Sequence, residues 1–137
     1  MYHKKARAFT LIEMMAVVVI IGLLAAVIGP KLFKPVEEAK VTTAKQEINT
    51  IGQQITLYQF QTGKFPEDLG DLRKDPDIKG WKGPYLDKKA VDPWDNKYQY
   101  RVPGEDGREF EVWSYGSDGK EGGDSGGEDV LGWEVDE

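Results

Sequence analysis

The sequence predicts an α+β fold in which one long N-terminal helix packs on a small C-terminal antiparallel sheet. Three observations support this prediction: a long apolar run in residues 9–29, a helical stripe of apolar residues in 41–58, and two alternating segments in 98–115. The chain has 137 residues, enough for one ordinary domain beside the apolar run.

The composition excludes several classes of active site. The chain has no cysteine, so it forms no disulfide and no thiolate metal site, and its one histidine is His3 in a basic leader. Without that leader no imidazole remains for acid–base catalysis or for zinc or iron ligation. The formal net charge of −6 argues against nucleic acid as a partner, because phosphate binding needs a basic surface. We therefore expect a protein that is not an enzyme.

Residues 9–29 predict a helix that spans a membrane. At about 1.5 Å per residue, a helix of this length covers roughly 30 Å, the hydrocarbon thickness of a bilayer. A cleaved secretory signal is the alternative, but the run is longer than usual for one and lacks a small-residue cleavage site before a polar start. By the positive-inside rule, three basic residues place the N-terminus in the cytoplasm: Lys4, Lys5 and Arg7.

Glu13 is the one charged residue in this apolar run. A carboxylate inside the bilayer costs on the order of 3 kcal/mol, unless it lies close enough to the headgroups to stay solvated. The run itself carries no cation. We therefore expect the compensating charge to come from another molecule or from an N-terminal amine created by cleavage.

Residues 41–58 predict an amphipathic helix whose apolar face packs on strands. Its apolar residues recur at steps of three and four, the helical period. Pro30 is expected to interrupt the helix before this segment, and Gly63 with Pro66 to close it. The stripe consists of Val41, Ala44, Ile48, Ile51, Ile55 and Tyr58.

The C-terminal half predicts a short sheet. Residues 61–97 are rich in turn formers but contain many apolar anchors, so we expect an ordered irregular connection. In residues 98–102 apolar residues alternate with polar ones, and in residues 110–115 Phe110, Val112 and Ser114 alternate with Glu111, Trp113 and Tyr115. Residues 103–107 join the two segments as a hairpin loop. Trp133 and Val135 are expected to add a third strand.

The segment around Glu13 resembles the class III signal of type IV pilins and pseudopilins. The matching residues are Lys-Ala-Arg-Ala-Phe-Thr-Leu-Ile-Glu at 5–13 and Met-Met-Ala-Val-Val-Val-Ile-Ile-Gly at 14–22. The resemblance implies a pilin-like fold, cleavage between Ala8 and Phe9 by a prepilin peptidase, and methylation of the Phe9 amine. It also implies that the Phe9 ammonium of one subunit neutralises Glu13 of a neighbour, and that Gly22–Pro30 is partly unwound in a filament. The family pattern has glycine before the cut, where this chain has Ala8.

Two further motifs resemble one branch of that family, the major pseudopilins of type II secretion. They are Gly83-Pro84-Tyr85-Leu86 and Asp92-Pro93-Trp94. The resemblance implies a structural subunit of the periplasmic pseudopilus, which helps to drive folded exoproteins through an outer-membrane channel. The implied partners are copies of the chain, minor pseudopilins, the inner-membrane assembly platform, the prepilin peptidase and membrane lipid.

The resemblance also implies an organisation and a location. Residues 1–8 form a cleaved basic leader, residues 9–35 a transmembrane assembly helix, and residues 36–137 a periplasmic globular domain. The protein would cross the bacterial inner membrane once, with its N-terminus in the cytoplasm.

The acidic glycine loop at residues 115–130 is a candidate calcium site. Six of the twelve residues in 116–127 are glycine, and Asp118, Asp124, Glu128 and Asp129 supply the hard oxygens that Ca²⁺ prefers. Major pseudopilins bind calcium in this loop. The resemblance implies the following ligands: the main chain of Tyr115, then Asp118, Ser125, Glu128 and Asp129.

Alternatives stay open at this stage. An EF-hand register from Asp118 would place Lys120 at a ligand position, and no Gly-Lys-Ser/Thr phosphate loop is present. The loop could instead be solvated and bind no ion. For the whole chain the alternatives are a type IV pilin for adhesion or motility, and a membrane-anchored calcium-binding domain that never polymerises.

Overall fold

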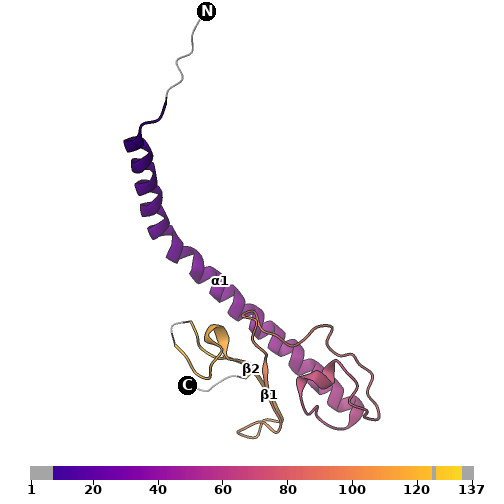
Figure 1. The fold of residues 1–137 in the computed structure, drawn as a ribbon. Helices are drawn as coiled ribbons and strands as arrows, with labels where there is room; N and C mark the ends of the chain where they lie inside the picture. Colours follow the sequence, from indigo (N-terminus) through magenta and orange to yellow (C-terminus); the bar gives the residue numbers. More distant parts are fainter. Residues whose placement is uncertain (1–7, 125, 134–137) are drawn as a thin grey trace, which may run out of the picture. The chain divides into compact units, whose positions relative to one another are not determined.

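The computed structural model describes residues 8–124 and 126–133, and the chain divides into two compact units, Met1–Val36 and Glu37–Glu137. The elements follow the order α1 (Leu11–Thr62), η1 (Leu69–Leu72), β1 (Gln99–Arg101), β2 (Glu111–Ser114), η2 (Gly116–Asp118) and β3 (Val130–Leu131). Figure 1 shows β1 and β2 beside the C-terminal part of α1. This helix-on-sheet arrangement confirms the predicted α+β fold class.

In the first unit, the large apolar side chains of α1 are exposed. A stretch of α1 near the N-terminus is long and apolar enough to cross a membrane, and none of it is buried. Phe9 is 79% exposed and Phe33 is 72% exposed. Since an apolar surface of this size is unfavourable in water, this unit requires a bilayer or other helices around it.

The expectation that Pro30 interrupts the helix is wrong for this chain, because α1 continues through both Pro30 and Pro35. A proline removes one hydrogen bond and crowds the preceding turn, whereas the turns on both sides keep their own bonds. The helix therefore tolerates each proline locally. The predicted unwinding of Gly22–Pro30 concerns an assembled filament and stays a prediction.

In the second unit, the predicted stripe of α1 forms one side of the core. Ala44 and Ile55 are fully buried, and Tyr58 is 2% exposed. The helix ends at Thr62, where Gly63 takes the left-handed conformation with φ +79° and donates its N–H to the Gln59 carbonyl. The other side of the core includes Leu72, Tyr98, Val112 and Val130.

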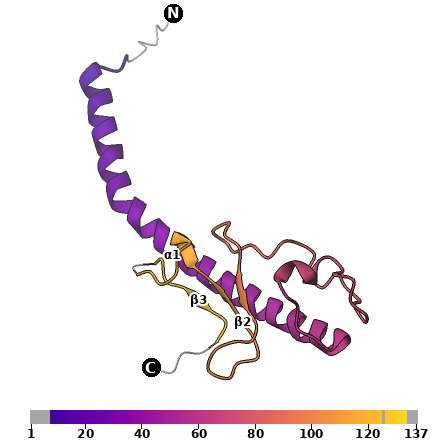
Figure 2. The ribbon, with the colours of Figure 1, turned by 60° about the horizontal axis from the view of Figure 1, so that its bottom comes forward.

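The sheet has three antiparallel strands in the order β1-β2-β3. Tyr100 pairs with Val112, and Ser114 pairs with Val130. Figure 2 shows β3 beside β2, on the side of β2 opposite to its hairpin partner β1. The predicted two-residue alternation places Tyr98 and Val112 in the core, as expected.

The third strand lies earlier than predicted. It spans Val130–Leu131, Trp133 follows its end, and Val135 lies outside the described residues. Burial of Val130, which is 3% exposed, fixes the register of β3 against β2. After β3, the Gly132 N–H continues this pairing by donating to the Val112 carbonyl at 3.1 Å. The strand thus begins directly where the acidic loop ends.

The irregular connection at residues 61–97 is held in place by hydrogen bonds from its aromatic side chains, as the sequence predicts. Trp81 Nε1 donates to the Asp71 carbonyl at 2.9 Å, and the Tyr85 hydroxyl donates to the Gln61 side chain at 2.7 Å. Trp94 Nε1 donates to Glu37 at 2.9 Å, which holds the Asp-Pro-Trp turn against α1.

Candidate functional site

Glu13 takes part in a helix cap at the start of α1. Its backbone N–H donates to Thr10 Oγ1 at 3.2 Å, and its Oε2 accepts from the Thr10 N–H at 2.9 Å. This reciprocal pair is a capping box, which the spacing of a threonine and a glutamate three residues apart could have revealed. An amide does not neutralise a carboxylate, so the expected cationic partner of Glu13 remains a prediction.

The predicted cleavage point lies just before this cap. Ala8 and Phe9 precede the first helical residue, and both are exposed. The bond between them is therefore not part of the hydrogen-bonded ladder of α1. The predicted assembly residues Gly22 and Pro30 both lie inside α1, and a Cβ on Gly22 would meet nothing within 4 Å.

The first half of the acidic loop is held in a defined conformation. Gly116 has φ +70°, and a Cβ at this position would overlap the Glu128 carbonyl oxygen. Its N–H donates to Ser114 Oγ at 3.0 Å, which fixes the peptide that follows Tyr115. Asp118 Oδ1 accepts from the Lys120 N–H at 3.0 Å in a local turn.

Two of the predicted carboxylates meet at one point of the loop. Asp129 Oδ2 accepts from the Gly122 N–H at 3.0 Å. Asp118 Oδ2 lies against the next residue, because a Cβ on Gly123 would come within 2.9 Å of it. The structure therefore brings Asp118 and Asp129 to the same Gly122–Gly123 segment.

One oxygen at this point has no partner among the described residues. Asp129 Oδ1 is buried and accepts no hydrogen bond there. A buried carboxylate oxygen without a donor is costly, and a hard cation would satisfy it. Asp118 and Asp129 therefore offer carboxylate oxygens of the kind that Ca²⁺ prefers.

The other predicted ligands are not gathered in the same way. Asp124 and Glu128 are exposed, and Ser125 lies outside the described residues. Among the residues that the structure describes, no group of three or more His, Cys, Asp or Glu side chains is placed to hold a metal. The predicted set also includes a carbonyl and a hydroxyl, so it does not depend on three carboxylates in one place.

Sequence analysis missed two functional contacts around the loop. Asp92 is 3% exposed, and its carboxylate bonds to the turn of residues 92–96 and to Ser114. An aspartate whose side chain accepts hydrogen bonds from backbone amides two and four residues later forms an Asx-type turn. The Asp-Pro-Trp-Asp-Asn sequence at residues 92–96 could have indicated this turn.

The second missed contact is Glu111 of β2, which the sequence analysis did not single out and which is 1% exposed. One oxygen accepts from Arg108 Nε at 2.6 Å and the other from Arg101 Nε at 2.8 Å. Burial by itself would raise the pKa of Glu111, but the bonds from Arg101 and Arg108 outweigh it and hold the pKa below its usual range.

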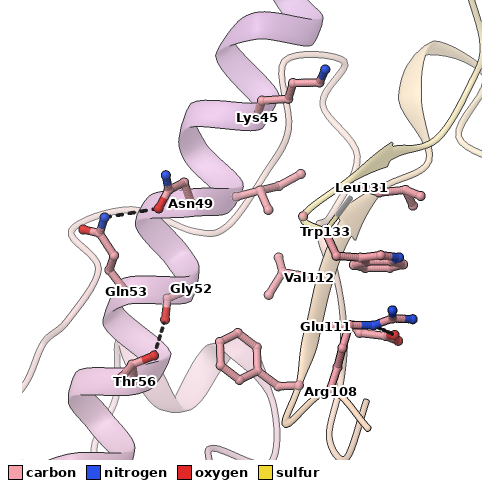
Figure 3. Close-up of a pocket in the computed structure, with 13 residues that line it drawn as sticks. Lys45, Asn49, Gly52, Gln53, Thr56, Arg108, Glu111, Val112, Leu131 and Trp133 are labelled. Atoms are coloured by element: carbon pink, nitrogen blue, oxygen red, sulfur yellow. Dashed lines mark hydrogen bonds and ion pairs between the residues drawn. The ribbon is translucent and has the colours of Figure 1, made fainter. Parts of the chain in front are cut away.

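A groove of about 1050 Å³ lies between α1 and the strands β2 and β3. Figure 3 shows Lys45 and Asn49 on the helix and Val112 pointing from the strand towards it, while Glu111 and Trp133 point away from the helix. Among the described residues that line the groove, Glu111 is the one carboxylate, and it accepts hydrogen bonds from two arginines and from the Glu105 N–H.

Comparison with known proteins agrees with this architecture. The family described as "Type II secretion system (T2SS), protein G" matches residues 31–133, and the "Prokaryotic N-terminal methylation motif" matches residues 3–29. The core protein G of the type II secretion system of Pseudomonas aeruginosa is 39% identical over 98% of this chain and 99% of its own length. The protein of the same name from Vibrio cholerae is 33% identical over 96% of this chain and 94% of its own length.

A solved structure supports the fold. The crystal structure of the major pseudopilin from the type 2 secretion system of enterohaemorrhagic Escherichia coli superimposes with a TM-score of 0.62. It covers 74% of this chain and 89% of its own, at 19% sequence identity.

These matches confirm the predicted resemblance and the prediction that the protein is not an enzyme, because this family consists of structural pseudopilins. They also favour type II secretion over the type IV pilin alternative. The chain belongs to the type II secretion system protein G family, the major pseudopilins, and carries the N-terminal methylation motif of that group.

Proposed function

We propose that this chain is the subunit that polymerises into the pseudopilus of a type II secretion system. The supporting observation is the exposed apolar surface of α1 in the first unit, beside a second unit that has its own core. In the membrane, lipid covers this surface, and in the filament the helices of neighbouring copies cover it. Addition of subunits then pushes folded exoproteins towards an outer-membrane channel.

The proposed topology is a single pass through the bacterial inner membrane. The basic residues before Phe9 keep the N-terminus in the cytoplasm, and residues 36–137 lie in the periplasm. There they would meet minor pseudopilins, while the apolar helix contacts lipid and the inner-membrane assembly platform. A cysteine placed in the second unit should react with a membrane-impermeant thiol reagent from the periplasmic side, since the natural chain has none.

We propose further that a prepilin peptidase cuts between Ala8 and Phe9 and that the new Phe9 amine is methylated. The match to the methylation motif and the exposure of both residues support this. Intact mass and N-terminal sequencing of the membrane-extracted protein should give a chain that starts at methylated Phe9. A chain that keeps Met1 would contradict the proposal.

The freed Phe9 ammonium of one subunit is proposed to neutralise Glu13 of its neighbour. The variants Glu13→Ala and Glu13→Gln separate this role from helix capping. Glutamine still completes a capping box but carries no charge. Charge compensation predicts that both variants insert into the membrane yet fail to assemble and to support secretion of an exoprotein.

The matched control for this experiment is Glu38→Gln, an exposed glutamate of α1 in the second unit, which should assemble normally. If Glu13→Gln assembles like the natural protein, the charge role is wrong and capping suffices. If both Glu13 variants assemble and secrete normally, the alternative of an anchored domain that does not polymerise gains support.

We also propose that the loop at residues 115–130 binds Ca²⁺. The unpartnered Asp129 Oδ1 and its neighbour Asp118 support this, with the Tyr115 carbonyl as a further ligand and Ser125, Glu128 and Asp124 as candidates for the rest. The ion would neutralise two adjacent carboxylates and hold the two halves of the loop together at the end of β2.

Melting of the full chain in detergent tests this proposal. Calcium at 100 times its Kd should stabilise the fold by about 2.7 kcal/mol, and a chelator should remove the effect. Asp118→Asn and Asp129→Asn should abolish the calcium response, whereas Glu121→Gln, an exposed acid of the same loop, should keep it. An identical melting temperature with calcium and with chelator would refute a structural ion.

A further inference from the structure

Asp92 lies outside the acidic loop but is connected to it through one side chain. Ser114 Oγ, which is fully buried, donates its proton to Asp92 Oδ2 at 2.5 Å. The same Ser114 Oγ accepts the Gly116 N–H at 3.0 Å. The carboxylate thus fixes the hydroxyl rotor of Ser114, and a hydroxyl whose proton is committed to an anion is a better acceptor for the amide.

The bond to the Gly116 N–H determines the direction of a carbonyl. The amide belongs to the planar peptide that joins Tyr115 to Gly116, in which N–H and C=O point in opposite directions. When Ser114 holds the N–H, the Tyr115 carbonyl is directed the other way. Gly116 has φ +70° at this point, a conformation that few residues other than glycine adopt readily.

The turn that contains Asp92 is itself rigid. Asp92 Oδ1 accepts the N–H groups of Trp94 at 3.0 Å and Asn96 at 2.9 Å. Trp94 is bonded in turn to Glu37 of α1, and Asn96 Nδ2 donates to the Gly116 carbonyl at 3.4 Å. The Asp92 carboxylate therefore connects this fixed turn, through Ser114, to the first residues of the acidic loop.

We propose that Asp92 and Ser114 are positioning residues that preorganise the Tyr115 carbonyl as a calcium ligand. This inference rests on the proposed calcium site and names the residues that hold its first half in place. Neither side chain touches the metal. Calcium binding then has to order the second half of the loop, where Asp129 supplies its unpartnered oxygen.

Calcium titration calorimetry of the full chain in detergent tests the proposal. Groups that orient metal ligands typically change affinity by 10- to 100-fold when they are removed. Asp92→Asn and Ser114→Ala should each weaken calcium binding by about tenfold or more. Asp95→Asn is the matched control, because Asp95 is an exposed acid in the same turn with φ +66°, a conformation that asparagine tolerates.

A second readout separates positioning from general stability. A merely structural role would lower the melting temperature of the calcium-free protein but leave the affinity of the folded protein unchanged. In NMR spectra of glycine-labelled protein without calcium, the chemical shift of the Gly116 amide should change in Ser114→Ala and in Asp92→Asn, but not in Asp95→Asn.

The outcomes are distinct. If the natural chain binds no calcium, the proposed calcium function fails. If it binds calcium and both Asp92→Asn and Ser114→Ala retain its affinity while folded, the positioning role is wrong and the calcium function stands.

Discussion

At the scale of single residues, the most heavily bonded charge is the Glu111 carboxylate. Its two oxygens accept bonds from Arg101, from Arg108 and from the Glu105 N–H. Arg101 also lies over the Trp113 ring at 5.4 Å, and Arg108 lies over the Trp133 ring at 4.8 Å. The carboxylate therefore holds two arginines that contact Trp113 of β2 and Trp133, which follows β3.

Replacing Glu111 by Gln should lower the free energy of unfolding by about 2 kcal/mol at neutral pH, because charge-assisted hydrogen bonds are lost. The folded pKa of Glu111 lies below its usual value, so the ionised group stabilises the fold above about pH 4.3 and loses this effect as the pH falls through the folded pKa. The difference from the natural chain should therefore shrink at about pH 3 in thermal melts.

Glu109→Gln is the control for Glu111→Gln, since Glu109 is an exposed glutamate on the same hairpin. It should leave the melting temperature within error at both pH values. Equal effects of the two substitutions would show that the arginine contacts of Glu111 contribute nothing specific.

At the scale of elements, α1 in the second unit is held by one face. Ile55 is fully buried against the sheet side of the core, whereas Leu57, two residues later, is 41% exposed. The same helix therefore carries core and surface positions within one turn. Its stability comes from packing of the apolar stripe rather than from helix propensity alone.

Ile55→Ala should destabilise the second unit by about 2–5 kcal/mol, because it removes buried methyl groups and leaves a cavity. Leu57→Ala should cost well under half of that, since its side chain remains partly in water. Urea unfolding followed by far-ultraviolet circular dichroism measures both. Similar losses for the two variants would contradict the assigned core face.

At the scale of the whole molecule, the two units differ in what they require. The first unit leaves its large apolar side chains exposed, and the second buries a core to which α1, the connection and the sheet all contribute. The core residues range from Ala44 to Val130 and so lie entirely in the second unit. We therefore expect this unit to fold without residues 1–36.

A chain reduced to residues 37–137 should fold, stay monomeric and melt cooperatively. It should not associate with membranes, because the apolar segment is gone. Sedimentation and calorimetry check these expectations. A fragment without a cooperative transition would mean that the first unit is needed for folding.

The sequence by itself determined the features that depend on neighbours along the chain. The apolar run, the methylation motif and the stripe of α1 are local patterns, and the hairpin follows from alternation around a turn. The role of each pattern could be predicted, because burial, membrane insertion and helix capping depend on residue type and on spacing along the chain. The capping box of Thr10 and Glu13 was equally readable but was not recognised.

Only the tertiary structure decided which polar groups meet across the fold. Glu111 alternates along β2 with the core residue Val112, yet it is buried as well, under two arginines from different parts of the hairpin. Asp92 reaches Ser114 across 22 positions, and Asp118 and Asp129 meet at a glycine pair between them. Such contacts depend on chain reversals and on the register of β3, which burial of Val130 sets and no local pattern encodes.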